Sequence, residues 1–146
     1  MNCYPFKNKK CEIFSDNRKI INVEENKRKY IAHNQSENKV CLAHVDSCLI
    51  NDEGVKCDFL LLNCEKKKCY FIELKGADLI HAIEQIDRSI DLLIPCITDF
   101  SINARIVLSK VYAPDLKSNQ LKRLELKLKK LKGDFIKKEK VLNEEI

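Results

Sequence analysis

The sequence predicts an α/β protein in which a central mixed β-sheet, containing an antiparallel meander, is flanked by α-helices. The chain has 146 residues, of which 45% are hydrophobic, and this is enough to bury one core. Only three Gly and three Pro interrupt it, which favours long regular elements. The spacing of the hydrophobic residues also changes along the chain from two to about 3.6, as in strands followed by a helix. We therefore expect one domain over residues 1–146, with its core at about 40–112 and a basic helix at about 116–132.

The first third of the chain predicts a short strand, a helix and a loop. Lys10–Phe14 has the composition of a strand. Ser15–Asn17 offers capping side chains for a helix that would run to about Tyr30, although the apolar residues of this segment fit the helical period poorly. The polar run Asn34–Asn38 then predicts a loop.

Three strands are expected next, because apolar runs alternate with groups of turn residues. The runs Val40–Ile50 and Val55–Leu62 are separated by the turn cluster Asn51–Gly54. Asn63–Lys68 turns the chain again before a third strand at Cys69–Lys75. Strands joined by loops this short pair in antiparallel fashion, so the three strands predict a meander.

The clearest helical pattern of the chain follows the meander. Apolar residues recur at helical spacing over Leu79–Ile94, Asp78 is a suitable N-cap, and Pro95 would end the helix. The run Ala104–Tyr112 is rich in apolar and β-branched residues and predicts another strand. The order of strand, helix and strand indicates an α/β sheet with helices on its faces.

The C-terminal part predicts a second helix and one more short element. The helix would begin at Pro114 and Asp115 and run to Lys132, with Gly133 just beyond its end. Phe135–Leu142 has the composition of a short strand. The helix carries an apolar stripe with spacings of three and four, formed by Leu121, Leu124, Leu128, Leu131 and Phe135. This stripe packs against the sheet or against a second copy of the chain, which would make a homodimer.

This C-terminal segment is also strongly basic. Residues 116–140 hold ten Lys or Arg and three Asp or Glu, although the net charge of the whole chain is only +5. Lysines that lie off the apolar stripe are expected to be exposed and to contact DNA phosphates, and the candidates are Lys122, Lys127 and Lys130. The alternative is a solvated helix surface without a ligand.

The eight cysteines predict reduced, buried thiols. No two of them have the C-x-x-C spacing that is typical of zinc sites, and most lie inside apolar runs, where Cys behaves as a small hydrophobic residue. The start of the chain has no apolar segment like that of a signal peptide, and no apolar run is long enough for a membrane helix. We therefore expect a cytoplasmic protein that does not enter a membrane. A cysteine-based metal or redox protein is the alternative.

Three charged residues, Asp58, Glu73 and Lys75, interrupt the two most apolar strands. A tight turn would set Asp58 opposite Lys75, and a looser turn would set it opposite Glu73. In both cases the alternation of side chains puts all three charges on one face of the sheet. Two carboxylates beside an ammonium suit a Mg²⁺ or Mn²⁺ ion, which polarises a phosphate and activates a water. The pattern predicts metal-assisted hydrolysis of a phosphodiester.

Asp58 followed, after a hairpin, by Glu73-Leu74-Lys75 resembles the core motif of the PD-(D/E)XK nuclease superfamily, with a Cys-Asp pair in place of Pro-Asp. The resemblance covers about residues 40–108 and implies a restriction-endonuclease-like fold. It implies that Asp58, Glu73 and the backbone carbonyl of Leu74 bind the metal ion. It also implies that Lys75 acts on the attacking water.

The same resemblance suggests further site residues and a function. Several branches of the superfamily use a Gln of the following helix, and Gln85 is the matching residue here. Many members also use an upstream acidic residue, for which the candidates are Glu24, Glu25, Glu37 and Asp46. We expect a magnesium-dependent nuclease that acts on DNA, in restriction, repair or defence. The alternative is a non-catalytic nucleic-acid-binding or assembly protein that retains a nuclease-like fold.

Overall fold

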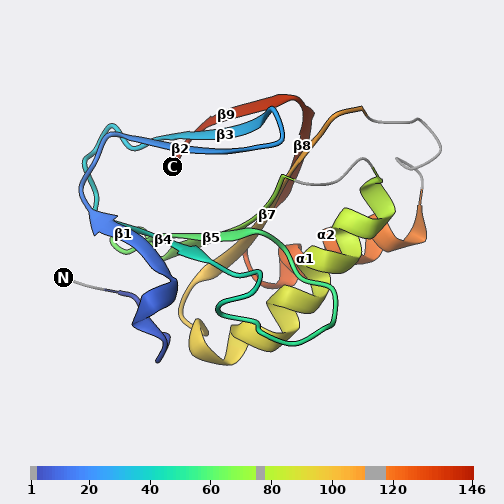
Figure 1. Ribbon diagram of the computed structural model, residues 1–146, viewed down its shortest axis with the longest axis horizontal. Helices are drawn as coiled ribbons and strands as arrows, with labels where there is room; N and C mark the ends of the chain where they lie inside the picture. The colour runs from blue at the N-terminus through green and yellow to red at the C-terminus, as the bar shows by residue number, and fades with distance from the viewer. Residues whose placement is uncertain (1–2, 75–77, 111–117) are drawn as a thin grey trace.

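The computed structural model describes residues 3–74, 78–110 and 118–146. The strands are β1 (Glu12–Asp16), β2 (Ile20–Glu25), β3 (Arg28–His33), β4 (Val40–His44), β5 (Phe59–Asn63), β6 (Lys68–Glu73), β7 (Ser101–Leu108), β8 (Phe135–Glu139) and β9 (Val141–Glu145). The helices are α1 (Leu79–Leu93) and α2 (Asn119–Lys130), with short 3₁₀ turns η1 (Lys9–Cys11) and η2 (Ile94–Cys96). These elements form three layers: a small sheet, a large sheet and the two helices (Figure 1).

The large sheet is mixed and contains the expected meander. Its six strands lie in the order β1-β4-β5-β6-β7-β8. The neighbours β4, β5 and β6 are antiparallel, which confirms the meander, whereas β6, β7 and β8 run parallel. The helices α1 and α2 connect these parallel strands, as parallel pairing requires.

Both helices lie on one face of the large sheet, so the expectation of helices on both faces was wrong. Leu60 and Phe71 pack with the helices in one apolar core. Their neighbours Leu61 and Ile72 point to the other face and pack in a second core beneath the small sheet β2-β3-β9. The second face is covered by strands because the first third of the chain forms strands instead of a helix.

The expected helix from Ser15–Asn17 to Tyr30 was wrong, because this segment forms β2 and β3. The two strands pair as an antiparallel hairpin whose turn residues, Asn26 and Lys27, have φ angles of 50° and 63°. Ile21 and Val23 are buried while the residues around them are exposed, so the true period is two. The expected loop at Asn34–Asn38 is confirmed.

Several other strands differ from their expected limits. Strand β4 ends at His44 and β5 begins at Phe59, so the intervening residues form a long loop in which Ile50 N–H donates to the carbonyl of Val45 (3.0 Å). The single short element expected at Phe135–Leu142 is two strands, which separate at Lys140 with a φ of 64°. This turn carries the chain from the large sheet to the small one.

The first helix is confirmed with its cap. Asp78 Oδ1 accepts hydrogen bonds from the backbone N–H groups of Ile80 (3.0 Å) and His81 (3.3 Å). The helix ends at Leu93, and Pro95 lies in the 3₁₀ turn that follows. An N-terminal aspartate cap satisfies N–H groups that have no partner within the helix.

The second helix begins at Asn119, with Ser118 as its N-cap. Pro114 and Asp115, the expected start, lie outside the described residues. At the other end the left-handed conformation belongs to Lys132 (φ 64°) and not to Gly133. Gly133 is needed for another reason, because a Cβ atom there would lie 1.8 Å from the carbonyl oxygen of Ile102.

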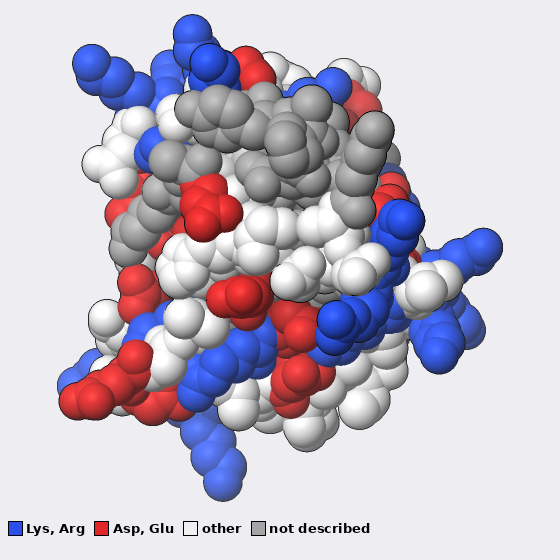
Figure 2. Space-filling view, turned by 90° about the vertical axis from the view of Figure 1, so that its right-hand side faces the viewer, with Lys and Arg blue, Asp and Glu red and all other residues white. Residues whose placement is uncertain are grey.

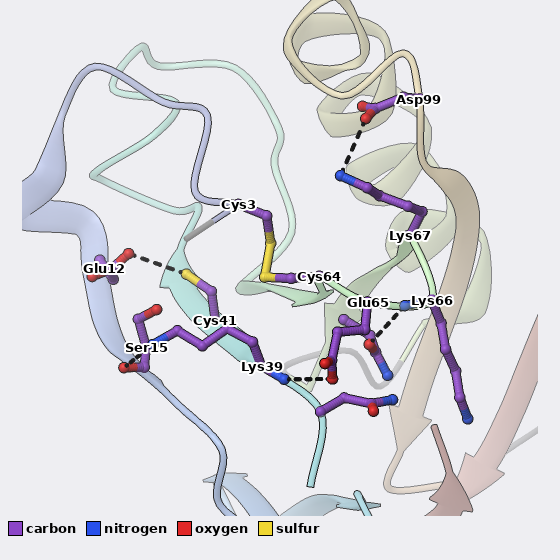
Figure 3. The surroundings of a disulfide bond; sticks show 12 residues. Cys3, Glu12, Ser15, Lys39, Cys41, Cys64, Glu65, Lys66, Lys67 and Asp99 are labelled. Carbon is purple, nitrogen blue, oxygen red and sulfur yellow. Dashed lines mark hydrogen bonds and ion pairs between the residues drawn. A yellow bond between two sulfur atoms is a disulfide. The ribbon is translucent and has the colours of Figure 1, made fainter. Parts of the chain in front are cut away.

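Two disulfides correct the expectation of reduced thiols for four of the cysteines. Cys3 is bonded to Cys64 and Cys11 to Cys48, with Cα–Cα distances of 5.4 and 5.5 Å. Figure 3 shows the first bond, which ties the N-terminal segment to the turn between β5 and β6. Sequence spacing did not indicate these pairs because the bonded cysteines are 61 and 37 residues apart in the chain. The remaining cysteines are free, and they are Cys41, Cys57 and Cys69, all buried, and exposed Cys96.

The disulfides also bear on the expected location. Cytosolic thiols are usually kept reduced, whereas disulfides are typical of oxidising compartments, so the structure gives the cytoplasmic expectation no support. Among the described helices, none has the length and apolar character needed to cross a membrane.

The disulfides predict a redox-dependent stability. Replacing Cys11 and Cys48 by Ser together should lower the free energy of unfolding by about 2–4 kcal/mol, because the bond closes a long loop in the unfolded chain. The melting temperature should fall by roughly 5–10 °C, measured by circular dichroism. Cys96→Ser is the matched control and should change little, since Cys96 is exposed and free. A wild-type melting temperature that is insensitive to a reductant would contradict this prediction.

Candidate carboxylate site at the end of β6

The two predicted carboxylates belong to residues that adjoin the last residue pair of the hairpin β5-β6. Strand β5 pairs with β6 so that Phe59 is opposite Ile72, and Asp58 and Glu73 are the next residue on either side of this pair. Asp58 N–H also donates to the carbonyl of Ile72 (3.1 Å). Of the two pairing registers that the sequence left open, this is the one with the looser turn between β5 and β6. Lys75 lies outside the described residues.

Both carboxylates are buried. Asp58 is 4% exposed and Glu73 is 0% exposed, and the two carboxylate oxygens of Glu73 have no solvent contact. The backbone N–H of Leu74 donates to Oδ2 of Asp58 (2.8 Å). This bond holds the backbone of Leu74, the residue that follows Glu73, against the Asp58 carboxylate.

Cys57 is a residue of this site that sequence reasoning missed. Burial raises the pKa of its thiol well above the ordinary value, and the negative charges of Glu73 and Asp58 raise it further. The backbone N–H of Cys57 donates to Ser89 Oγ of α1 (2.8 Å), which fixes this part of the chain against the helix. The position of Cys57 directly before Asp58 could have indicated its place in the site, but the sequence pattern predicted only a buried structural thiol there.

Helix α1 also brings Gln85 to the strand that carries Asp58. Gln85 Nε2 donates to the carbonyl of Lys56 (3.1 Å), two residues before Asp58. Its Oε1 is buried and has no hydrogen-bond partner within the described parts of the chain. The backbone carbonyl of Gln85 accepts a hydrogen bond from Ser89 Oγ (2.7 Å), so the two side chains that contact the Lys56–Cys57 segment are coupled.

Among the four upstream acidic candidates, Asp46 is the one next to Asp58. It follows Val45, whose N–H donates to the carbonyl of Asp58 (3.0 Å), and its Oδ1 lies 4.0 Å from Lys56 Nζ. Glu24 and Glu25 lie on β2 in the small sheet, on the opposite face of the large sheet from α1. Glu37 lies in the loop before β4, where its carbonyl accepts from Asn17 (2.8 Å).

The donors of this site match magnesium better than zinc. Within residues 3–74, 78–110 and 118–146, no three or more His, Cys, Asp or Glu side chains form a metal-binding group. Magnesium is held by one or two carboxylates and keeps several waters, so the pair Asp58 and Glu73 with a backbone carbonyl is enough for it. A structural zinc ion would need four protein ligands.

The basic residues predicted on α2 have different surroundings. Lys122 and Lys130 are exposed, as expected. Lys127 is not a free surface lysine, because its Nζ forms ion pairs with Asp87 (2.6 Å) and Asp91 of α1. Burial opposes the charge of Lys127, but these hydrogen-bonded carboxylates outweigh it and raise the lysine pKa.

The apolar stripe of α2 packs against the chain's own sheet and helix. Leu121, Leu124 and Leu128 are buried in the same core as α1 and β7. The sequence left open whether the stripe packs within the chain or against a second copy, and in the structure it packs within the chain. The carbonyl of Leu131 accepts from Ile102 N–H (3.2 Å), so α2 ends beside the start of β7. Lys130 therefore lies at the far end of the sheet from Glu73, and Lys122 lies nearer.

The described residues form an α/β structure with two mixed sheets, of six and three strands, and two helices packed against them. Comparisons of the chain with protein-family models, with curated proteins and with solved structures found no match. A functional assignment must therefore come from the residues of the site.

The ion pairs of Lys127 predict a stability difference between two lysines of α2. Lys127→Ala should lower the free energy of unfolding by about 0.5–1 kcal/mol, because the pairs are partly solvated and exposed pairs contribute little more. Lys122→Ala should have almost no effect, since Lys122 is exposed on the same helix. Urea denaturation of both variants measures the difference, and equal stabilities would show that the pairs with α1 contribute nothing.

Proposed function

We propose that this protein is a metal-dependent nuclease of the PD-(D/E)XK type that hydrolyses DNA phosphodiester bonds. The observation that carries the proposal is that two buried carboxylates, those of Asp58 and Glu73, adjoin the last residue pair of two central strands. Two such carboxylates repel each other, and burial strengthens the repulsion. A divalent cation bound between them would remove it, which gives a physical reason to keep both in an apolar sheet.

The residues of the site have separate roles in this proposal. Asp58, Glu73 and the carbonyl of Leu74 would hold a Mg²⁺ or Mn²⁺ ion. Such an ion polarises the phosphate and lowers the pKa of a bound water. The hydrogen bond from Leu74 N–H to Asp58 supports this arrangement because it holds the Leu74 backbone beside the carboxylate. Lys75 would orient the attacking water and stabilise the charge that develops on the phosphate.

Two further residues complete the proposed site from neighbouring segments. Asp46 would serve as the upstream acidic residue, since its loop is bonded to the backbone of Asp58. Gln85 would line the site from α1, and its buried Oε1 is available to accept a hydrogen bond there. Phosphate contacts would come from Lys122, whereas Lys127 is engaged by α1 and Lys130 lies at the far end of the sheet. A role in restriction, repair or defence follows only from analogy with other nucleases.

The proposal predicts that Glu73→Gln abolishes magnesium-dependent cleavage of plasmid DNA. Loss of one metal carboxylate should reduce the rate by at least about 100-fold, because transition-state stabilisation by the ion is lost. The variant should also lose the increase in melting temperature that Mn²⁺ gives the wild type, a readout that does not depend on cleavage. Circular dichroism checks the fold.

Glu125→Gln is the matched control, because Glu125 is exposed on α2 and its loss removes the same charge. Cleavage by Glu73→Gln at the wild-type rate, at normal magnesium, would remove the assignment. A wild type that binds DNA but never cleaves it with either metal would favour the non-catalytic alternative.

The basic residues of α2 predict a salt-dependent affinity. Replacing Lys122 by Ala should weaken binding of a short duplex similarly for all sequences, because lysine contacts to phosphate carry no base information. The slope of log affinity against log salt should become shallower by about 0.9 for each contact that is lost. Replacing the exposed Lys9 and Lys10 of η1 by Ala is the control. An unchanged slope in the Lys122 variant would identify this lysine as solvated surface only.

A further inference from the structure

We infer that the groove between α1 and α2 is the docking site for a second copy of this chain, with the twofold axis running along the groove. This inference does not depend on the proposed nuclease activity. The groove has a volume of about 470 Å³, and its apolar lining consists of Ile83, Leu124 and Leu126. Leu126 of α2 lies at this groove and is 60% exposed, so its side chain is accessible to a partner.

The two helices that form the groove run side by side in the same direction. Strands β6, β7 and β8 are parallel, and α1 and α2 each connect two of them, so each helix must run back against the strands. The ion pairs of Lys127 with Asp87 and Asp91 show which turns of the helices are level with each other. Arg123 lies one helical turn before Lys127 on α2, and Glu84 lies about one turn before the Asp87–Asp91 part of α1. Glu84 and Arg123 are therefore at nearly the same height along the groove.

The two walls of the groove have opposite charge. On the α1 wall stand Glu84 and Asp87, and on the α2 wall stand Arg123, Lys127 and Lys130. Lys127 is satisfied within the chain by its pairs with α1. Glu84, Arg123 and Lys130 are exposed, and none of the ion pairs between described residues includes them. Glu84, without an ion-pair partner among the described residues, thus lies on one side of the apolar residues of the groove, and Arg123 and Lys130, also without such a partner, lie on the other side.

This charge pattern selects one arrangement of two copies. A twofold axis along the groove exchanges the positions of α1 and α2 but keeps their direction. The α1 wall of each copy then faces the α2 wall of the other, and Glu84 of one copy lies at the height of Arg123 of the second copy. A twofold axis across the groove would instead set like walls against each other. In the favoured arrangement, Leu126 of each copy meets the apolar floor of the other groove, which removes its surface from water.

The same pattern disfavours a nucleic acid as the occupant. A phosphate backbone binds surfaces of one positive sign, whereas this groove has two carboxylates, Glu84 and Asp87, on its α1 wall. Figure 2 shows the end of the molecule at which both helices begin, and positive and negative side chains are intermixed there. A surface with both signs and an apolar centre is typical of a protein interface.

The test uses two single charge reversals and their mixture. Wild type should form a concentration-dependent dimer in sedimentation equilibrium. Glu84→Arg and Arg123→Glu should each weaken the dimer by at least about tenfold, because each places like charges on facing walls. An equimolar mixture of these two variants should recover dimers. In the mixed pair, one copy carries arginine at both positions and the other carries glutamate at both, so both facing pairs become attractive. Leu126→Ser should weaken the dimer without any change in charge.

Lys10→Glu is the control for a change of two charge units away from the groove, and it should leave the dimer unchanged. Melting curves confirm that each variant is folded, which is expected because the substituted side chains are exposed. A wild type that stays monomeric at millimolar concentration would overturn the inference and leave the groove to a different protein. A dimer that is indifferent to both reversals, or a mixture that fails to recover dimers, would also overturn it.

Discussion

The pairing register of β5 with β6 constrains most of this structure. Both strands are buried on both faces: Leu60 and Phe71 face the helices, while Leu61 and Ile72 face the small sheet. A shift of one residue would reverse the faces of one strand relative to the other. Such a shift would carry Glu73 into the apolar layer between the sheets, where a carboxylate is costly. The hydrophobic packing of two cores therefore also determines where the two site carboxylates lie.

The small sheet is attached to the large one by a buried polar network. Arg105 on β7 donates to Glu144 on β9 (2.6 Å) and pairs with Asp134 (2.8 Å), and Tyr30 on β3 also donates to Glu144 (2.7 Å). Burial raises the pKa of the Tyr30 hydroxyl well above its ordinary value, so the tyrosine stays a neutral donor. Buried charges are costly unless they are paired. Here the guanidinium of Arg105 is paired with two carboxylates, and one of these pairs links the large sheet to the small sheet. The acidic residues of β2 are thereby kept on the far face from the carboxylate pair.

The parallel part of the sheet brings several functional features to one edge. Crossover connections of the same hand place α1 and α2 on the same face, and both helices begin near the ends of the strands that precede them. Glu73 is the last residue of β6, and α1 begins a few residues later at Leu79. Ligands of open α/β sheets commonly bind at such strand ends. The edge near Glu73 is thus where the proposed substrate would meet the site, while the groove between the helices stays available for a second copy.

Features that depend on residues close together in the sequence were predicted correctly, whereas features that depend on distant residues were not. The helix at Leu79–Leu93 was predicted with its Asp78 cap because period and capping depend on residues a few positions apart. The hairpin of β2 and β3 was predicted as a helix, because its apolar residues gain burial only from a distant partner, the large sheet. The basic character of α2 was evident, but no local pattern indicated that Lys127 is neutralised by another helix.

The sequence by itself determined the meander, the first helix, and the presence of Asp58 and Glu73 on one face of two apolar strands, since side-chain alternation is a local property. Only the tertiary structure decided the register of β5 against β6, the hydrogen bond from Leu74 N–H to Asp58, and that four cysteines form disulfides. These features join residues far apart in the chain. Their geometry is fixed by the packing of the two cores, because close packing selects one register and one set of neighbours among many that the local sequence allows.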